Sequence, residues 1–163
     1  MTRPDYTTQA GGAALGGRLR RLSSAIDADA ARVYAAVGVD FEQRWFGVLN
    51  QLALNGAMTV SELGVALHIT HVSVSQTRDS LARAGFVQSA PHESDARKRS
   101  LTLTRKGTAL VAKLRPLWDA FDDAARQLDT EAGDVAAALD RLDAALDKRS
   151  MYDRIMASLP GQA

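Results

Sequence analysis

The sequence predicts a mainly α-helical protein with one small β-hairpin. Three observations support this fold class. Apolar residues recur every three or four positions near both ends of the chain, two short helical patterns meet at a tight turn before Gly85, and two β-type runs flank a basic loop after it. With 163 residues and 46% hydrophobic content, the chain can bury the core of one ordinary domain.

Composition excludes several classes of protein. The chain has no cysteine, which excludes disulfides, thiolate zinc sites and a cysteine nucleophile. No stretch approaches the roughly 20 apolar residues of a membrane span, and the N-terminal residues lack the apolar centre of a signal peptide. We therefore expect a cytoplasmic protein. Because no Gly-rich phosphate loop and no His-Glu-x-x-His motif is present, we expect neither an enzyme nor a cofactor.

The net charge of +1 conceals an asymmetry along the chain. Residues 71–115 carry nine Lys and Arg against three Asp and Glu, whereas residues 116–153 carry four against ten. Both segments are compatible with solvated helix faces. The more specific interpretation is a basic surface for a polyanion, with an acidic part that stays away from it.

The N-terminal part of the sequence combines a tail with a long helix. Residues 1–14 lack an apolar period and are expected to form a flexible tail, as are residues 160–163. From residue 15 the steps of three and four predict one stripe of an amphipathic helix that stops at Gly38. The stripe consists of Leu15, Leu19, Leu22, Ile26, Ala30, Val33 and Val37.

Residues 41–85 predict a helix followed by a helix-turn-helix. The first helical segment, 41–56, ends at Gly56. Thr59 and Glu62 have the spacing of a capping box, which predicts a short helix that buries Leu63, Ala66 and Leu67. After a turn at 68–70, Thr70 caps a helix of about 14 residues. Its inward residues are Val74, Leu81 and Ala84, and its more exposed ones are His71, Ser73, Gln76, Ser80 and Arg83.

A hairpin and two further helices follow. The runs "FVQSA" and "SLTLT" flank the loop "PHESDARKR", which predicts a hairpin with a basic tip. Thr104 is placed to cap the next helix, and Pro116 should kink or break that helix locally. The last helix should begin near residue 129 or 130. A winged helix-turn-helix with long N- and C-terminal helices is the predicted architecture.

The terminal helices have more apolar surface than a central module of about fifty residues can cover. Packing against a second copy is one solution, and a monomeric bundle is the other. We assign residues 15–40 and 104–159 to a helical dimerisation region and residues 41–103 to the winged helix-turn-helix. The dimerisation residues are Leu15, Leu19, Leu22, Leu139, Leu142 and Leu146.

Two segments resemble a known family. "SDARKRSLTLTRKG" resembles the wing signature of the multiple-antibiotic-resistance regulator (MarR) family, and "VSVSQTRDSLARAGFV" is similar to its recognition helix. The resemblance extends over roughly residues 15–155. It implies a homodimer joined through its first and last helices, with two recognition helices in successive major grooves of a pseudo-palindromic operator. Members commonly repress transcription and release DNA when a small, often aromatic, anion binds.

The wing is expected to reach a neighbouring minor groove, where negative potential attracts an inserted arginine. We assign that role to Arg97, with Lys98 and Arg99 on phosphates or supporting the loop. Asp95 either orients a wing arginine through a charge-assisted hydrogen bond or simply forms a turn.

The recognition helix is expected to contact base edges near its N-terminal end. Gln76 could read adenine by two hydrogen bonds, and Ser73 and Ser75 are suited to phosphates. The complete predicted set is His71, Ser73, Ser75, Gln76 and Ser80. Arg78 and Arg83 contact the DNA backbone or are solvated.

Two further sites are weaker hypotheses. His68, His71 and His92 suggest a metal, but they straddle a turn and a loop without a matching ligand pair, so we expect no metal. An effector pocket could combine aromatic walls with a cation. Its candidates are Tyr34, Arg44, Trp45 and Phe46, although such aromatics are more often core residues.

The sequence thus favours a dimeric, sequence-specific DNA-binding regulator, a repressor released by a small-molecule effector. The alternative is a winged-helix protein-interaction module that does not bind DNA and uses its acidic C-terminal helices on a partner.

Overall fold

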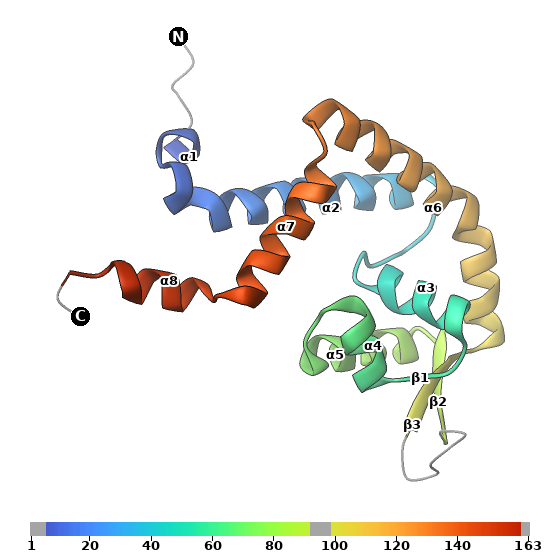
Figure 1. Ribbon diagram of the computed structural model, residues 1–163. Helices are drawn as coiled ribbons and strands as arrows, with labels where there is room; N and C mark the ends of the chain where they lie inside the picture. Colours follow the sequence, from blue (N-terminus) through green and yellow to red (C-terminus); the bar gives the residue numbers. More distant parts are fainter. Residues whose placement is uncertain (1–5, 92–98, 161–163) are drawn as a thin grey trace. The chain divides into compact units, whose positions relative to one another are not determined.

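The computed structural model describes residues 6–91 and 99–160. The chain divides into two compact units, residues 1–112 and 113–163. Figure 1 shows the elements of the first unit in chain order. They are α1 (Tyr6–Gln9), the 3-10 helix η1 (Gly11–Ala14), α2 (Leu15–Ala36), α3 (Trp45–Asn55), β1 (Met58–Thr59), α4 (Val60–Leu67), α5 (His71–Arg83), β2 (Val87–Pro91) and β3 (Arg99–Leu103). Helix α6 (Arg105–Ala132) begins in this unit and ends in the second.

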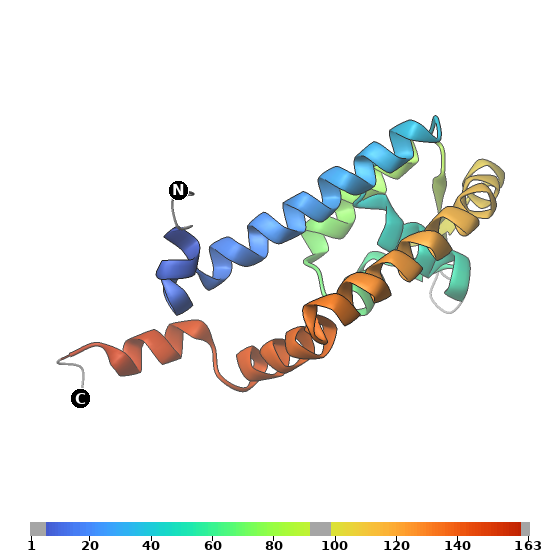
Figure 2. The same ribbon diagram turned by 90° about the horizontal axis from the view of Figure 1, so that it is seen from above.

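The N-terminal residues contain more structure than the sequence predicted. Within the expected tail, residues 6–9 form α1 and residues 11–14 form η1. Helix α2 begins at Leu15 and is followed by Gly38 in the left-handed region, as the stripe predicted. Near its end Tyr34 is buried and stacks on Phe41, with ring centroids 4.3 Å apart. The N-terminal half of α2 extends beyond the winged module (Figure 2).

The helix-turn-helix is held by side-chain caps that the sequence predicted. Thr59 and Glu62 form a complete capping box at the start of α4: Thr59 N donates to the Glu62 carboxylate at 2.7 Å, and Glu62 N donates to Thr59 Oγ1 at 3.2 Å. Thr70 Oγ1 accepts from Ser73 N at 3.2 Å at the start of α5. Between the helices His68 adopts a left-handed conformation, φ 51°, which closes the turn.

The core of the winged module comes from the inward faces of these helices. It includes Val48, Leu49, Leu63, Val74 and Leu81, all fully buried. The short helix α4 buries less than predicted, since Leu67 is half-buried and Ala66 is exposed.

The hairpin is part of a three-stranded antiparallel sheet in the order β1-β3-β2. Strand β3 pairs with β2 from Val87↔Leu103 to Pro91↔Arg99, and with β1 at Met58↔Leu101 and Thr59↔Ser100. Strand β1 was not predicted, because a strand of two residues is too short to show an alternation of apolar and polar residues. The predicted fold class, mainly α with a small hairpin wing, is confirmed.

The start of α6 is fixed against the end of α5. Thr104 caps it as predicted: its Oγ1 accepts from Gly107 N at 3.0 Å and donates to the carbonyl of Gly85 at 2.7 Å. Gly107 lies so close to Phe86 that an added Cβ would stand 2.0 Å from the Phe86 carbonyl oxygen. Only glycine fits at this position.

The second unit consists of the rest of α6, α7 (Val135–Lys148) and α8 (Met151–Ser158). Helix α6 continues through Pro116, so of the two predicted outcomes, a kink or a local break, the break does not occur. Proline removes only the bond to the carbonyl of residue 112, and the rest of the ladder persists. In α7, Leu139 and Leu146 are exposed and Leu142 is half-buried. Within residues 6–91 and 99–160, no helix is long and apolar enough to cross a membrane.

Candidate nucleic-acid interface

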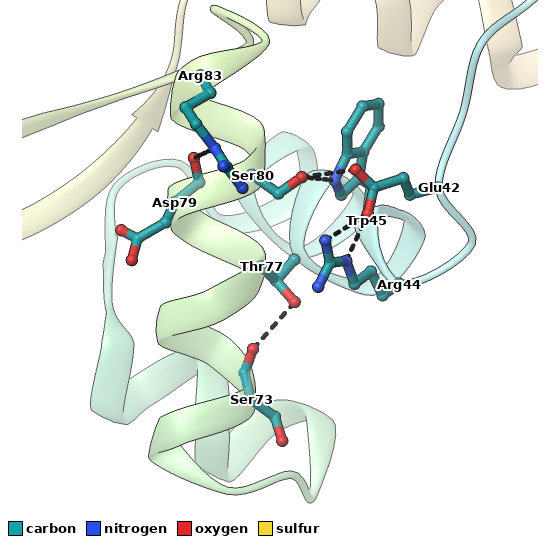
Figure 3. A network of polar contacts seen from close by, with 8 residues as sticks. All are labelled: Glu42, Arg44, Trp45, Ser73, Thr77, Asp79, Ser80 and Arg83. Atoms are coloured by element: carbon teal, nitrogen blue, oxygen red, sulfur yellow. Dashed lines mark hydrogen bonds and ion pairs between the residues drawn. The ribbon is translucent and has the colours of Figure 1, made fainter.

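Helix α5 has one buried and one solvent-facing side. Val74, Thr77 and Leu81 are buried, and Thr77 Oγ1 donates to the carbonyl of Ser73 at 3.0 Å (Figure 3). The predicted contact residues His71, Ser73 and Gln76 are exposed and Ser75 is half-buried. The structure therefore brings four of the five predicted recognition-helix residues to the first half of the helix with accessible side chains.

Ser80 is the exception, and its predicted exposure is wrong. Its side chain is 6% exposed and faces the start of α3 instead of solvent. Ser80 Oγ donates to Glu42 Oε1 at 2.7 Å and accepts from Trp45 Nε1 at 3.0 Å (Figure 3). Its hydroxyl is committed to the interior, because one bond ties it to Glu42 in the α2–α3 connection and the other to Trp45, the first residue of α3. We therefore remove Ser80 from the set of candidate DNA contacts.

Glu42 links this buried bond to a surface arginine. Its second oxygen, Oε2, accepts from Arg44 Nε at 2.6 Å. The hydrogen bond from Ser80, followed by the bond to Arg44 and the charges of Arg44 and Arg83, lowers the pKa of Glu42, while burial acts in the opposite direction. The carboxylate is thus held in its charged form where the α2–α3 connection meets α5.

The solvent-facing side of α5 carries a continuous stripe. Val72, Gln76, Asp79 and Arg83 follow each other at steps of four and three, and all are exposed. Arg78 Nη2 pairs with Asp79 Oδ1 at 2.8 Å, and Arg83 Nε donates to the Asp79 carbonyl at 3.3 Å. These arginines are thus ordered along the helix, next to the side chains that could reach a polyanion.

The hairpin is described only at its base. Asp95, Arg97 and Lys98 lie outside the described residues. Arg99, the first residue of β3, donates from Nε to Ser89 Oγ at 3.0 Å and from Nη2 to the Ser89 carbonyl at 3.2 Å. Of its two predicted roles, the geometry favours support of the hairpin, because both bonds hold β2.

Lys106 has a structural role at the start of α6. Its Nζ donates to the carbonyl of Ala84 at 2.8 Å and lies 4.7 Å from the centroid of the Phe86 ring. The ammonium group thus satisfies a free carbonyl at the C-terminal end of α5 and rests on an aromatic face. In the described part of the basic run, Arg99 thus holds the base of the hairpin, and Lys106 holds the junction between α5 and α6.

The four predicted effector-pocket residues are divided between different environments. Tyr34 and Trp45 are buried in the aromatic core, whereas Arg44 and Phe46 are exposed. Arg44 lines a depression of about 600 Å³ together with Gln76, Asp79, Ala82 and Arg83. Tyr34 lines a second depression, of about 430 Å³, at residues 31–41. These two depressions do not unite the four residues.

The histidines form no recognisable metal site in the part of the chain that the structure describes. His68 and His71 flank the turn between α4 and α5, and His92 lies outside the described residues. Among residues 6–91 and 99–160, no group of three His, Asp or Glu side chains is placed to hold a metal ion.

Two features of the site escaped sequence reasoning. Glu42 is separated from Ser80 by 38 positions, and no local pattern joins them. The exposure of Val72 could have been predicted from the sequence, because it lies four residues before Gln76 and outside the inward stripe of α5. It was missed because only polar side chains were considered as contacts.

Part of the chain is similar to a known family of proteins. The family model described as "MarR family" matches residues 38–98, a range that includes α3, α4, α5 and β2. No curated protein matches the chain.

Solved structures match over most of the chain. A MarR family regulator from Neisseria meningitidis is 28% identical, with 82% of this chain and 92% of that chain covered and a TM-score of 0.61. A mutant MarR from E. coli in complex with operator DNA is 22% identical, with coverages of 87% and 99% and a TM-score of 0.66. BpsR of Bordetella bronchiseptica, whose DNA binding is regulated by 6-hydroxynicotinic acid, is 21% identical, with coverages of 78% and 91% and a TM-score of 0.64.

Proposed function

We propose that this chain, whose residues 38–98 match the MarR family model and whose fold is similar to that of a MarR family regulator, acts as a homodimer that recognises a pseudo-palindromic DNA site by its sequence. The observation that carries this proposal is the solvent-facing side of α5. It presents the exposed amide of Gln76 and small polar side chains in the first half of the helix, where helix-turn-helix proteins contact base edges.

The proposed contacts divide between bases and backbone. Gln76 reads an adenine by two hydrogen bonds, and His71, Ser73 and Ser75 position the helix on phosphates and neighbouring base edges. Arg97 enters the minor groove, with Lys98 on phosphates and Asp95 orienting the arginine. Arg99 supports them from the base of the hairpin. Ser80 takes no part in DNA contact.

The dimer is proposed to form through residues 15–40 and 104–159, with residues 41–103 as the DNA-binding region. The exposed apolar stripe of α2 supports this division. Leu15, Leu19 and Leu22 are all exposed, and an apolar stripe of this length is normally covered by a partner. The counterpart is the stripe of α7, formed by Leu139, Leu142 and Leu146.

We further propose that the protein is a cytoplasmic repressor that a small aromatic anion releases from DNA. The similar fold of BpsR, which is regulated by 6-hydroxynicotinic acid, supports a ligand of this class. Arg44 and Arg83 line one depression beside Gln76, so an anion bound there would lie next to the proposed base contact.

A salt titration tests the central proposal. The full chain is mixed with random duplex DNA, and affinity is measured from low to physiological salt. For a DNA-binding protein, the logarithm of the binding constant falls linearly with the logarithm of salt concentration, because binding releases condensed cations from the phosphates. Absence of any binding at low salt would instead favour the protein-interaction module, with the acidic residues 116–153 as its docking surface.

A further inference from the structure

Val72 is an exposed apolar residue at a position where the fold does not need one. It is the second residue of α5, and 64% of its surface is accessible. A β-branched residue is a poorer helix former than alanine, and it cannot cap the helix. The Val72 side chain is therefore accessible to a partner molecule.

The helix places Val72 beside the proposed base-reading residue. Val72 and Gln76 are four residues apart on the solvent-facing side, with Val72 one turn closer to the N-terminus. Side chains at this spacing have Cβ atoms about 5–6 Å apart, and successive base pairs rise about 3.4 Å. A helix that aims Gln76 at one base pair therefore aims Val72 at a base pair one or two steps away.

The isopropyl group of Val72 has one suitable apolar partner in the major groove. Base edges there present hydrogen-bond donors and acceptors, and their apolar feature is the C5-methyl group of thymine. Valine cannot bond to a phosphate or to a polar edge. Valine in a helix has one strongly favoured χ1 rotamer, so its methyl groups are already fixed before DNA binds and little side-chain entropy is lost on contact.

We propose that Val72 is a specificity-determining residue that contacts the 5-methyl group of a thymine within one or two base pairs of the one read by Gln76. This inference rests on the proposed function. It predicts that the half-site contains an A·T pair at that position, selected by an apolar contact instead of a hydrogen bond.

The test uses the full chain and a site selected from random duplex DNA. Each thymine of that site is replaced, one at a time, by deoxyuridine, which removes only the methyl group. We expect one thymine per half-site at which the loss weakens binding roughly fourfold, the factor for one buried methyl-sized group. Val72→Ala should weaken binding to the parent site by a similar factor and make that thymine insensitive to the replacement.

Val65→Ala is the matched control. Val65 is also strongly exposed, at 78%, but it lies on α4. This variant should keep the wild-type response to every deoxyuridine. Sequence-specific binding with a deoxyuridine response that Val72→Ala leaves unchanged would overturn the role of Val72 alone. Equal losses of DNA affinity in Val65→Ala and Val72→Ala would instead assign both residues to an apolar protein-docking patch. Failure to bind any duplex would overturn the proposed function itself.

Discussion

Ser80 on α5 donates a hydrogen bond of 2.7 Å to Glu42 in the α2–α3 connection while it accepts one of 3.0 Å from the Trp45 indole. One hydroxyl thus joins the proposed recognition helix to the segment that follows α2. Because the bond to Trp45 is buried, the orientation of α5 depends on a residue that touches no DNA in our proposal.

Replacement of Ser80 by alanine should therefore destabilise the protein. The change leaves the buried Trp45 N–H without its acceptor, which costs about 1–3 kcal/mol. Urea unfolding followed by tryptophan fluorescence measures the loss. Ser75→Ala, on the same helix but half-buried, should change the free energy of unfolding by less than about 0.5 kcal/mol. Equal stabilities of the two variants would contradict the importance of the Ser80 contacts.

Acid should remove part of the Ser80 contribution. The hydrogen bond from Ser80 lowers the pKa of Glu42 in the folded state, so the stabilisation is complete above the pKa of the unfolded chain and is lost as the pH falls through the folded pKa. The difference in unfolding free energy between wild type and Ser80→Ala should be constant near neutral pH and shrink in acid. An NMR titration of the Glu42 carboxyl carbon should show its pKa rising in Ser80→Ala and staying low in Ser75→Ala.

Gly107→Ala should destabilise the junction between α5 and α6. The new Cβ would stand 2.0 Å from a backbone oxygen of Phe86, and such overpacking costs about 1–3 kcal/mol or more. Thermal unfolding measures this. Gly17→Ala is the control, since a Cβ on Gly17 in α2 meets nothing within 4 Å. In that variant the free energy of unfolding should increase by about 0.5–1 kcal/mol, because alanine has a higher helix propensity than glycine. A Gly107→Ala protein as stable as wild type would show that the backbone moves aside.

Leu22→Glu should convert the proposed dimer into monomers. Leu22 is 54% exposed on the apolar stripe of α2, and a buried unpaired carboxylate in the interface would be strongly unfavourable. Sedimentation equilibrium gives the mass of each variant. Ser24→Glu adds the same charge to the same helix, away from the stripe, and should remain dimeric. A wild-type chain that sediments as a monomer would favour the single-chain bundle.

Arg97→Ala and Gln76→Ala should affect DNA binding in different ways. Loss of Arg97 should weaken binding to all sequences and reduce the salt slope by about one, because one phosphate-neutralising cation is missing. Loss of Gln76 should change the preference at one base pair by about 1–3 kcal/mol. Titrations at several salt concentrations, on the selected site and its single-base variants, separate the two effects. An unchanged salt slope for Arg97→Ala would remove Arg97 from the interface.

The local parts of this fold were accessible from the sequence because their causes are local. Thr59 with Glu62, Thr70 and Thr104 each act within four residues of their partners, and all three predicted caps are present. The left-handed glycine that ends α3 likewise depends only on its own backbone.

The misjudged parts depend on contacts between distant residues. Ser80 looked solvent-facing because a serine adds nothing to an apolar period, and its partners lie 35 and 38 positions away. Strand β1 has two residues and exists only because β3 pairs with it across the sheet.

Thr59 is both the last residue of β1 and the N-cap of α4. Through Ser100 it is paired to the central strand of the sheet that carries the hairpin. Thr59 therefore connects the sheet directly to the helix-turn-helix, and the two parts move as one unit. The base of the hairpin, residues 87–91 and 99–103, therefore keeps a fixed position relative to α4, so a duplex that is aligned by the helix-turn-helix is also aligned with this part of the sheet.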